Sequence, residues 1–174
     1  SNLIRKLLST LSIFFRNTKV NKKKDNIILD EIKYLIRFNK KNSNLENIHK
    51  IFNDKMYKLL STNKLENFLR ENFIQKMFFV HNRLFILSEL KALKQNKNWK
   101  FYKYLIKEDS IGNPIRYFLY SQSSGNRINH VYHLSILKDE LKVDLKGIRN
   151  IFEFGAGYGC MARIFSKIGK NINY

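Results

Sequence analysis

The residues with the clearest chemical potential are three glycines spaced two residues apart, Gly155, Gly157 and Gly159, preceded by an acidic residue, Glu153. Glycine lets the backbone turn sharply and lets a ligand approach main-chain atoms without an intervening Cβ. If a helix begins directly after the turn, its unpaired N–H groups and the positive end of its dipole favour an anionic part of the ligand. The spacing therefore predicts a ligand-binding turn.

The flanking residues indicate the elements that would position this turn. Residues 148–154 are rich in β-branched and aromatic side chains, which are typical of a strand. Residues 160–168 have the pattern of a helix that stops at Gly169, and residues 171–174 could begin a second strand. Strand, glycine turn, helix and strand make up the βαβ unit that opens a doubly wound parallel sheet.

The spacing of the glycines argues against a dinucleotide site. The dinucleotide fingerprint is G-x-G-x-x-G, which requires a glycine at position 160, and this chain has Cys160 there. The third glycine is Gly159, which gives G-x-G-x-G instead. Two alternatives stay open for the same residues: a nicotinamide-binding oxidoreductase, and a tight turn in some other α/β domain.

The segment 152–159, Phe-Glu-Phe-Gly-Ala-Gly-Tyr-Gly, resembles the first motif of class I methyltransferases that depend on S-adenosyl-L-methionine (SAM). Together with residues 128–134, Ile-Asn-His-Val-Tyr-His-Leu, it resembles the sugar O-methyltransferase family over about residues 110–174. The resemblance implies SAM as the cofactor and transfer of its methyl group to a sugar hydroxyl in glycan or polysaccharide biosynthesis. The residues that it implies for cofactor binding are Glu153, Gly155, Ala156, Gly157, Tyr158 and Gly159.

The resemblance ends after one βα unit, at Tyr174. By analogy with dinucleotide folds, the acidic residue that holds the ribose hydroxyls would come roughly 20 residues past the glycines. The half of the domain that supplies substrate contacts and a catalytic base would also follow. We therefore expect an N-terminal fragment of a longer methyltransferase, inactive alone, and we assign no catalytic residue.

Two histidines, His130 and His133, lie three residues apart in the helix expected over residues 128–141, and so share one face of it. The family resemblance favours a substrate or cofactor-loop role, and ordinary structural or surface histidines are the alternative. No acidic or cysteine partners stand at ligand spacing, so we expect no metal. Cys160, the only cysteine, is expected to be a small packing residue, and it fits a reducing, cytoplasmic location.

The preceding residues have helical periodicity. We expect helices over about residues 25–38 and 45–59, and one long helix or two joined near His81 over residues 65–93. Thr62 resembles the start signal of that last helix. Loops are expected at residues 111–114 and 121–126.

The expected fold class is α/β, with a mostly α-helical N-terminal region followed by the first βα unit of a truncated Rossmann-like methyltransferase domain. The expected domains are residues 1–125, which are basic and mostly helical, and residues 126–174, the incomplete SAM-binding part.

The chain has 33 basic and 14 acidic residues, a formal net charge of +19. Residues 1–107 contain 24 of the basic and 8 of the acidic residues. An alternative function is therefore a basic helical module that binds nucleic acid or a membrane and carries a nonfunctional Rossmann-like remnant. Nucleic acid is disfavoured because lysine outnumbers arginine 24 to 9.

Aromatic residues between lysines over residues 99–107 could stack on bases, and the alternative is an ordinary core contact. Residues 3–16 are too short and polar to span a bilayer, although their helical spacing would allow a weak peripheral membrane contact.

Overall fold

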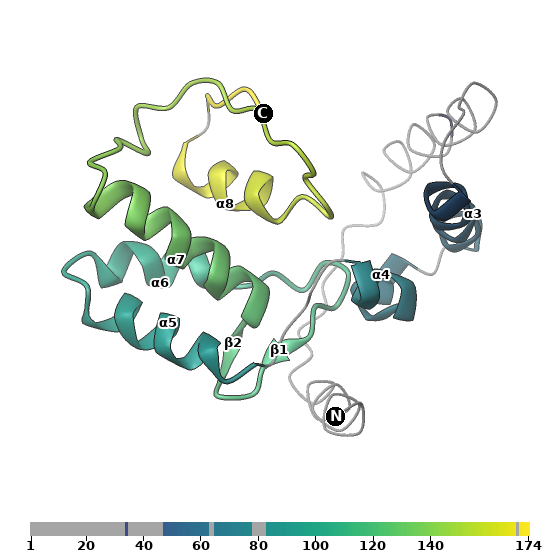
Figure 1. The fold of residues 1–174 in the computed structure, drawn as a ribbon, viewed down its shortest axis with the longest axis horizontal. Coiled ribbons are helices and arrows are strands. Elements are labelled where there is room, and N and C mark those ends of the chain that lie inside the picture. The colour runs from purple at the N-terminus through teal and green to yellow at the C-terminus, as the bar shows by residue number, and fades with distance from the viewer. Residues whose placement is uncertain (1–33, 35–46, 63–64, 78–82, 170) are drawn as a thin grey trace. The chain divides into compact units, whose positions relative to one another are not determined.

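The computed structural model of the chain describes Tyr34 and residues 47–62, 65–77, 83–169 and 171–174 (Figure 1). The helix expected at 25–38, the amphipathic residues 3–16 and the junction at His81 lie outside these residues, apart from Tyr34, which is helical. The elements are α3 (Asn47–Ser61), η2 (Leu65–Arg70), α4 (Asn72–Met77), α5 (Phe85–Gln95), α6 (Trp99–Ile106), β1 (Arg116–Tyr117), β2 (Tyr120–Ser124), α7 (Gly125–Asp139) and α8 (Cys160–Ile168). The described part of the chain is mostly helical, with one small antiparallel sheet of β1 and β2.

The described residues fall into two compact units. The first contains residues 83–109 and 115–174, and the second contains residues 47–77 and 110–114, with the gaps given above. The expected domain limit at residue 125 falls inside the first unit, at the point where β2 passes into α7.

The core of the first unit is built around α7, which contacts α5, α6 and α8 (Figure 1). Ile128, Val131 and Leu134 form the inward stripe of α7 at helical spacing, and all three are buried. They pack with apolar residues of the three neighbouring helices. Those partners include Ile86, Leu90 and Leu93 of α5, Tyr102, Leu105 and Ile106 of α6, and Ile164 and Phe165 of α8.

The sequence predicted the helix at 128–141 but placed its ends too late. The helix begins at Gly125 because the Ser124 hydroxyl accepts a hydrogen bond from the Arg127 N–H at 3.2 Å, and so caps it. It ends at Asp139, so Leu141 lies beyond the helix and is exposed. Leu137 is also largely exposed.

The loop expected at 121–126 is wrong. Residues 120–124 form β2, which pairs antiparallel with β1 in the register Arg116↔Ser124 and Tyr117↔Tyr120. Two of the small polar residues that suggested a loop, Ser123 and Ser124, are buried in the fold.

Of the two arrangements expected over residues 65–93, the single long helix is wrong, because the described residues form η2, α4 and α5 instead. Asn67 has the non-helical dihedrals φ −122° and ψ 20°, which kink η2. Thr62 does not start a helix: its hydroxyl donates to the carbonyls of Lys58 (3.0 Å) and Leu59 (3.1 Å) at the end of α3.

In the second unit, α3 confirms the helix expected near 45–59, and the turn expected at 111–114 is present. Gly112 has φ +72°, and a Cβ on it would lie 2.2 Å from the ring of Phe68. Arg70 closes the same turn by donating from Nε to the Asn113 carbonyl at 2.9 Å.

The helix expected at 160–168 is confirmed as α8, and the N–H of Gly169 donates to the Phe165 carbonyl at its end. The strand expected at 148–154 is not formed. Among the described residues this segment has one parallel bridge, between Asn150 and Asn173. Its hydrogen bonds run from the Asn173 N–H to the Arg149 carbonyl and from the Ile151 N–H to the Asn173 carbonyl, both at 2.8 Å.

None of the helices in the described residues has the length and apolar character needed to cross a membrane.

The core position of α7 gives the first prediction. Leu134→Ala removes a side chain that is 1% exposed and should lower the free energy of unfolding by about 2–5 kcal/mol. The matched control, Leu137→Ala, changes a side chain of the same helix that is 39% exposed and should cost about 1 kcal/mol at most. Urea unfolding followed by circular dichroism measures both, and equal losses would contradict this packing.

Candidate functional site

The glycine turn before α8 has the backbone geometry that only glycine adopts easily. Gly155, Gly157 and Gly159 have φ of +75°, +58° and +76°, all in the left-handed region. Gly159 is the N-cap of α8, and its N–H donates to the Ala156 carbonyl at 2.9 Å. A Cβ added to Gly155 or Gly159 would meet no atom within 4 Å, so the turn borders open space.

Glu153 lies half-buried at the start of the turn and connects it to the last residues of the chain. Its Oε2 accepts a hydrogen bond from the Tyr174 hydroxyl. Burial and this carboxylate raise the pKa of Tyr174, so the phenol keeps its proton. The Asn173 side chain also donates to the Asn150 side chain at 2.9 Å, next to the parallel bridge.

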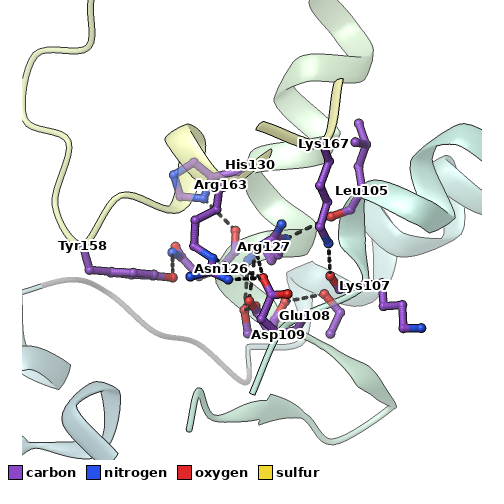
Figure 2. A network of polar contacts seen from close by, with 12 residues as sticks. Leu105, Lys107, Glu108, Asp109, Asn126, Arg127, His130, Tyr158, Arg163 and Lys167 are labelled. Atoms are coloured by element: carbon purple, nitrogen blue, oxygen red, sulfur yellow. Dashed lines mark hydrogen bonds and ion pairs between the residues drawn. The ribbon is translucent and has the colours of Figure 1, made fainter. Parts of the chain in front are cut away.

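Tyr158 is the residue of the turn whose side chain contacts α7. Its hydroxyl accepts a hydrogen bond of 2.5 Å from Nδ2 of Asn126, in the first turn of α7 (Figure 2). Burial, with the nearby Cys160 and Glu108, raises the pKa of Tyr158. Cys160 is itself buried, which raises the pKa of its thiol to about 12. The thiol is therefore neutral near pH 7 and serves as a packing group.

Next to Asn126 in α7 lies a network of charged side chains around Arg127, which is fully buried (Figure 2). Its Nε donates to the Leu105 carbonyl at 3.0 Å, and its Nη1 donates to Glu108 Oε1 at 3.2 Å. Nη1 also lies 3.7 Å from Asp109 Oδ2. Nη2 is buried and has no hydrogen-bond partner among the described residues. Glu108 is held in turn by the Ser124 hydroxyl, which donates to its Oε2 at 2.5 Å.

Asp109 connects this network to α8. Arg163 of α8 contacts Asp109 Oδ2 through Nη2 at 2.6 Å and through Nε at 3.1 Å. Burial by itself would raise the pKa of Asp109, but the hydrogen bond and charge of Arg163 and the charges of two further cations lower it. One of these cations, Lys167, also donates to the Lys107 carbonyl at 2.6 Å.

The two histidines of α7 lie in different surroundings. His130 is half-buried, and its Nδ1 lies 2.7 Å from the carbonyl of Asn126, whose side chain contacts the glycine turn. Because a carbonyl only accepts, Nδ1 carries the proton. His133 is exposed and its ring lies against Tyr132. Within the described ranges, no group of three or more His, Cys, Asp or Glu side chains could hold a metal ion.

The structure thus brings together Tyr158, Asn126 and His130, and it pairs Glu153 with Tyr174. Sequence reasoning missed the charged network next to Asn126. Arg127 gave one signal, since it falls four residues before Val131 on the otherwise apolar stripe of α7. The residues missed were Glu108, Asp109, Asn126, Arg127 and Arg163.

Chemically, the turn suits binding of a polar, partly anionic ligand. Left-handed glycines leave main-chain groups open to a ligand, and α8 begins directly after them with its unpaired N–H groups.

The buried charge pair predicts a large effect from removing one partner. Arg127→Met leaves the buried carboxylate of Glu108 without its cation, and should lower the free energy of unfolding by about 3–5 kcal/mol. Adding Glu108→Gln removes the uncompensated charge and should recover part of the loss. Urea unfolding of both variants tests this, and equal stability of the single and double variants would contradict it.

Asp109 predicts a pH dependence. A carboxyl whose pKa is lowered by folding stabilises the protein above its ordinary pKa of about 3.9 and loses this contribution as the pH falls through the folded-state value. Asp109→Asn should therefore lose less stability than the unchanged chain between about pH 5 and about pH 3. The control Glu140→Gln, at an exposed carboxylate, should behave like the unchanged chain. Denaturant unfolding at both pH values decides, and parallel curves for Asp109→Asn would refute the pairing.

Comparison of the chain with protein-family models, with curated proteins and with solved structures finds no match.

Proposed function

We propose that the glycine turn binds SAM and that the chain contributes the cofactor-binding βα unit of a methyltransferase. The observation that supports this best is the turn itself. Three left-handed glycines stand between Glu153 and the first residue of α8, and the Cβ positions of Gly155 and Gly159 are open. A side chain at those positions would occupy the space that a bound cofactor needs.

The parallel bridge supports the same proposal. Asn150 and Asn173 flank the turn and α8, and they pair in parallel. Parallel neighbours require a crossover connection, usually a helix, which α8 supplies here. The proposed Rossmann-like unit extends this single bridge into two strands.

Two phenylalanines beside the turn fit this extension. Phe152 and Phe154 are 92% and 95% exposed, and they alternate with the half-buried Ile151 and Glu153. Strands of a parallel sheet are covered on both faces, so apolar residues occur on both. In the proposed domain these two side chains lie on a face that further elements cover.

In this proposal the main-chain groups of the turn and the start of α8 hold the methionine part of SAM, and Tyr158 fixes the end of the turn. When bound, the cofactor supplies a methyl group that an oxygen nucleophile accepts by in-line displacement. The protein's tasks are to align the two reacting atoms and to accept the hydroxyl proton. We propose a sugar hydroxyl as the acceptor, from the resemblance of residues 128–134, and place His130 on the side of the turn where Asn126 lies.

The aromatic residues of α6 argue against the alternative function, a basic helical module that binds nucleic acid through stacked bases. Trp99 and Phe101 are half-buried against the core, and Tyr102 is fully buried. Only Tyr104 of this group is exposed, and Lys167 lies over its ring at 5.6 Å. Most aromatic side chains of α6 therefore belong to the hydrophobic core and are not available to stack on bases.

Calorimetric titration of the full chain with SAM tests the proposal. Gly155→Ala should weaken SAM binding by roughly tenfold or more, while its left-handed alanine costs only about 1–2 kcal/mol of stability. Gly112→Ala is the control, because it places alanine at a similar φ in the second unit, where its Cβ also meets the Phe68 ring. It should lower stability more than Gly155→Ala does, without changing SAM affinity.

Absence of SAM binding to the unchanged chain would refute the proposal, as would equal affinity of the Gly155→Ala variant. Repeating the titration at higher salt separates the alternatives. Affinity at the glycine turn should change little, whereas binding of a polyanion to the basic surface should weaken steeply.

A further inference from the structure

The glycine turn has little packing of its own. Residues 154–157 are all exposed, and the Cβ positions of Gly155 and Gly159 face open space. Glycine has more conformational freedom to lose on ordering than any other residue. A turn with three of them needs an outside contact to remain in one conformation.

Tyr158 supplies that contact. It is half-buried, unlike the residues just before it, and its hydroxyl accepts the hydrogen bond from Asn126 Nδ2 at 2.5 Å. The backbone next to it is also fixed, since the Gly159 N–H bonds the Ala156 carbonyl and the Arg163 N–H bonds the Gly159 carbonyl at 3.1 Å. Tyr158 thus connects the conformationally free glycines to α7.

Asn126 is well placed to act as the fixed end. It lies in the first turn of α7, two residues after the Ser124 cap and directly before the buried Arg127. Its carbonyl is bonded by His130 Nδ1 at 2.7 Å (Figure 2). The position of its side chain is therefore set by a helix that is held in the core on several sides.

We infer that Asn126 is a positioning residue, which holds the glycine turn in its ligand-binding conformation through the Tyr158 hydroxyl. Its effect on SAM affinity rests on the proposed function, whereas its effect on the order of the turn does not.

Amide hydrogen exchange of the full chain, followed by NMR, measures the order of the turn without any ligand. The reporters are the Gly159 and Arg163 amides, whose hydrogen bonds close the turn and join it to α8. Asn126→Ala and Tyr158→Phe should each speed their exchange by roughly three- to tenfold, the effect of one hydrogen bond. The double variant should exchange no faster than Tyr158→Phe alone, because Tyr158→Phe already removes the contact with Asn126.

Two further variants separate positioning from general stability. Asn126→Asp keeps a partner, since the phenol can donate to a carboxylate, and should exchange like the unchanged chain. Asn129→Ala is the matched control: it lies on the same helix and donates to Glu89 Oε1 at 2.8 Å, away from the turn. It should leave both reporter amides unchanged.

SAM titration of the same variants completes the test. Asn126→Ala and Tyr158→Phe should weaken SAM binding by a similar factor, and Asn126→Asp should restore it. Unchanged exchange in both single variants, or additive effects in the double variant, would overturn the inference. If the unchanged chain fails to bind SAM, the proposed function is refuted, and the exchange rates still decide whether Asn126 orders the turn.

Discussion

The guanidinium of Arg127 is enclosed by protein, and the first unit depends on how its charge is balanced. Glu108 and Asp109 supply the negative charge from the segment that directly follows α6, and the Leu105 carbonyl takes a further hydrogen bond. A buried ion pair with one partner removed is strongly destabilising. The end of α6 and the start of α7 are therefore held together, and Asp109 extends the same connection to Arg163 of α8.

Helix α7 serves two purposes, one through its inward-facing residues and one through its first turn. Its inward stripe of Ile128, Val131 and Leu134 forms the centre of the core. Its first turn carries Asn126, which contacts the glycine turn from outside that core. Flexible glycines and a rigid helix thus have complementary roles: the glycines give the backbone shape that a ligand requires, and the helix limits the conformations that the glycines would otherwise sample.

The sequence made the local elements predictable where a strong periodicity or a glycine stop was present. Helix α8 and the glycines before it are examples, because the left-handed positions and the helix limits are set by neighbouring residues. Residues 121–126 were mistaken for a loop, since serine and glycine favour turns locally while their use in β2 and in the cap of α7 depends on distant partners such as Glu108.

The candidate site was predictable only in its backbone part. Glu153, the three glycines and Tyr158 stand together in the sequence, so one motif identifies them. Asn126 and Asp109 come from segments that are brought to the turn and to α8 by tertiary packing, and no short-range pattern records that. The prediction of a strand at 148–154 is wrong for a related reason. A strand requires a paired neighbour, and the described residues supply one only at Asn150.

The parallel bridge has a consequence for the order of folding. Asn150 and Asn173 are 23 residues apart in the chain, and bringing such distant residues together costs loop-closure entropy before any hydrogen bond repays it. Once α8 is helical, the segment between them is compact and the remaining loop to close is short. We therefore expect the bridge to form after α8, because the helix lowers the loop-closure cost of pairing these two residues.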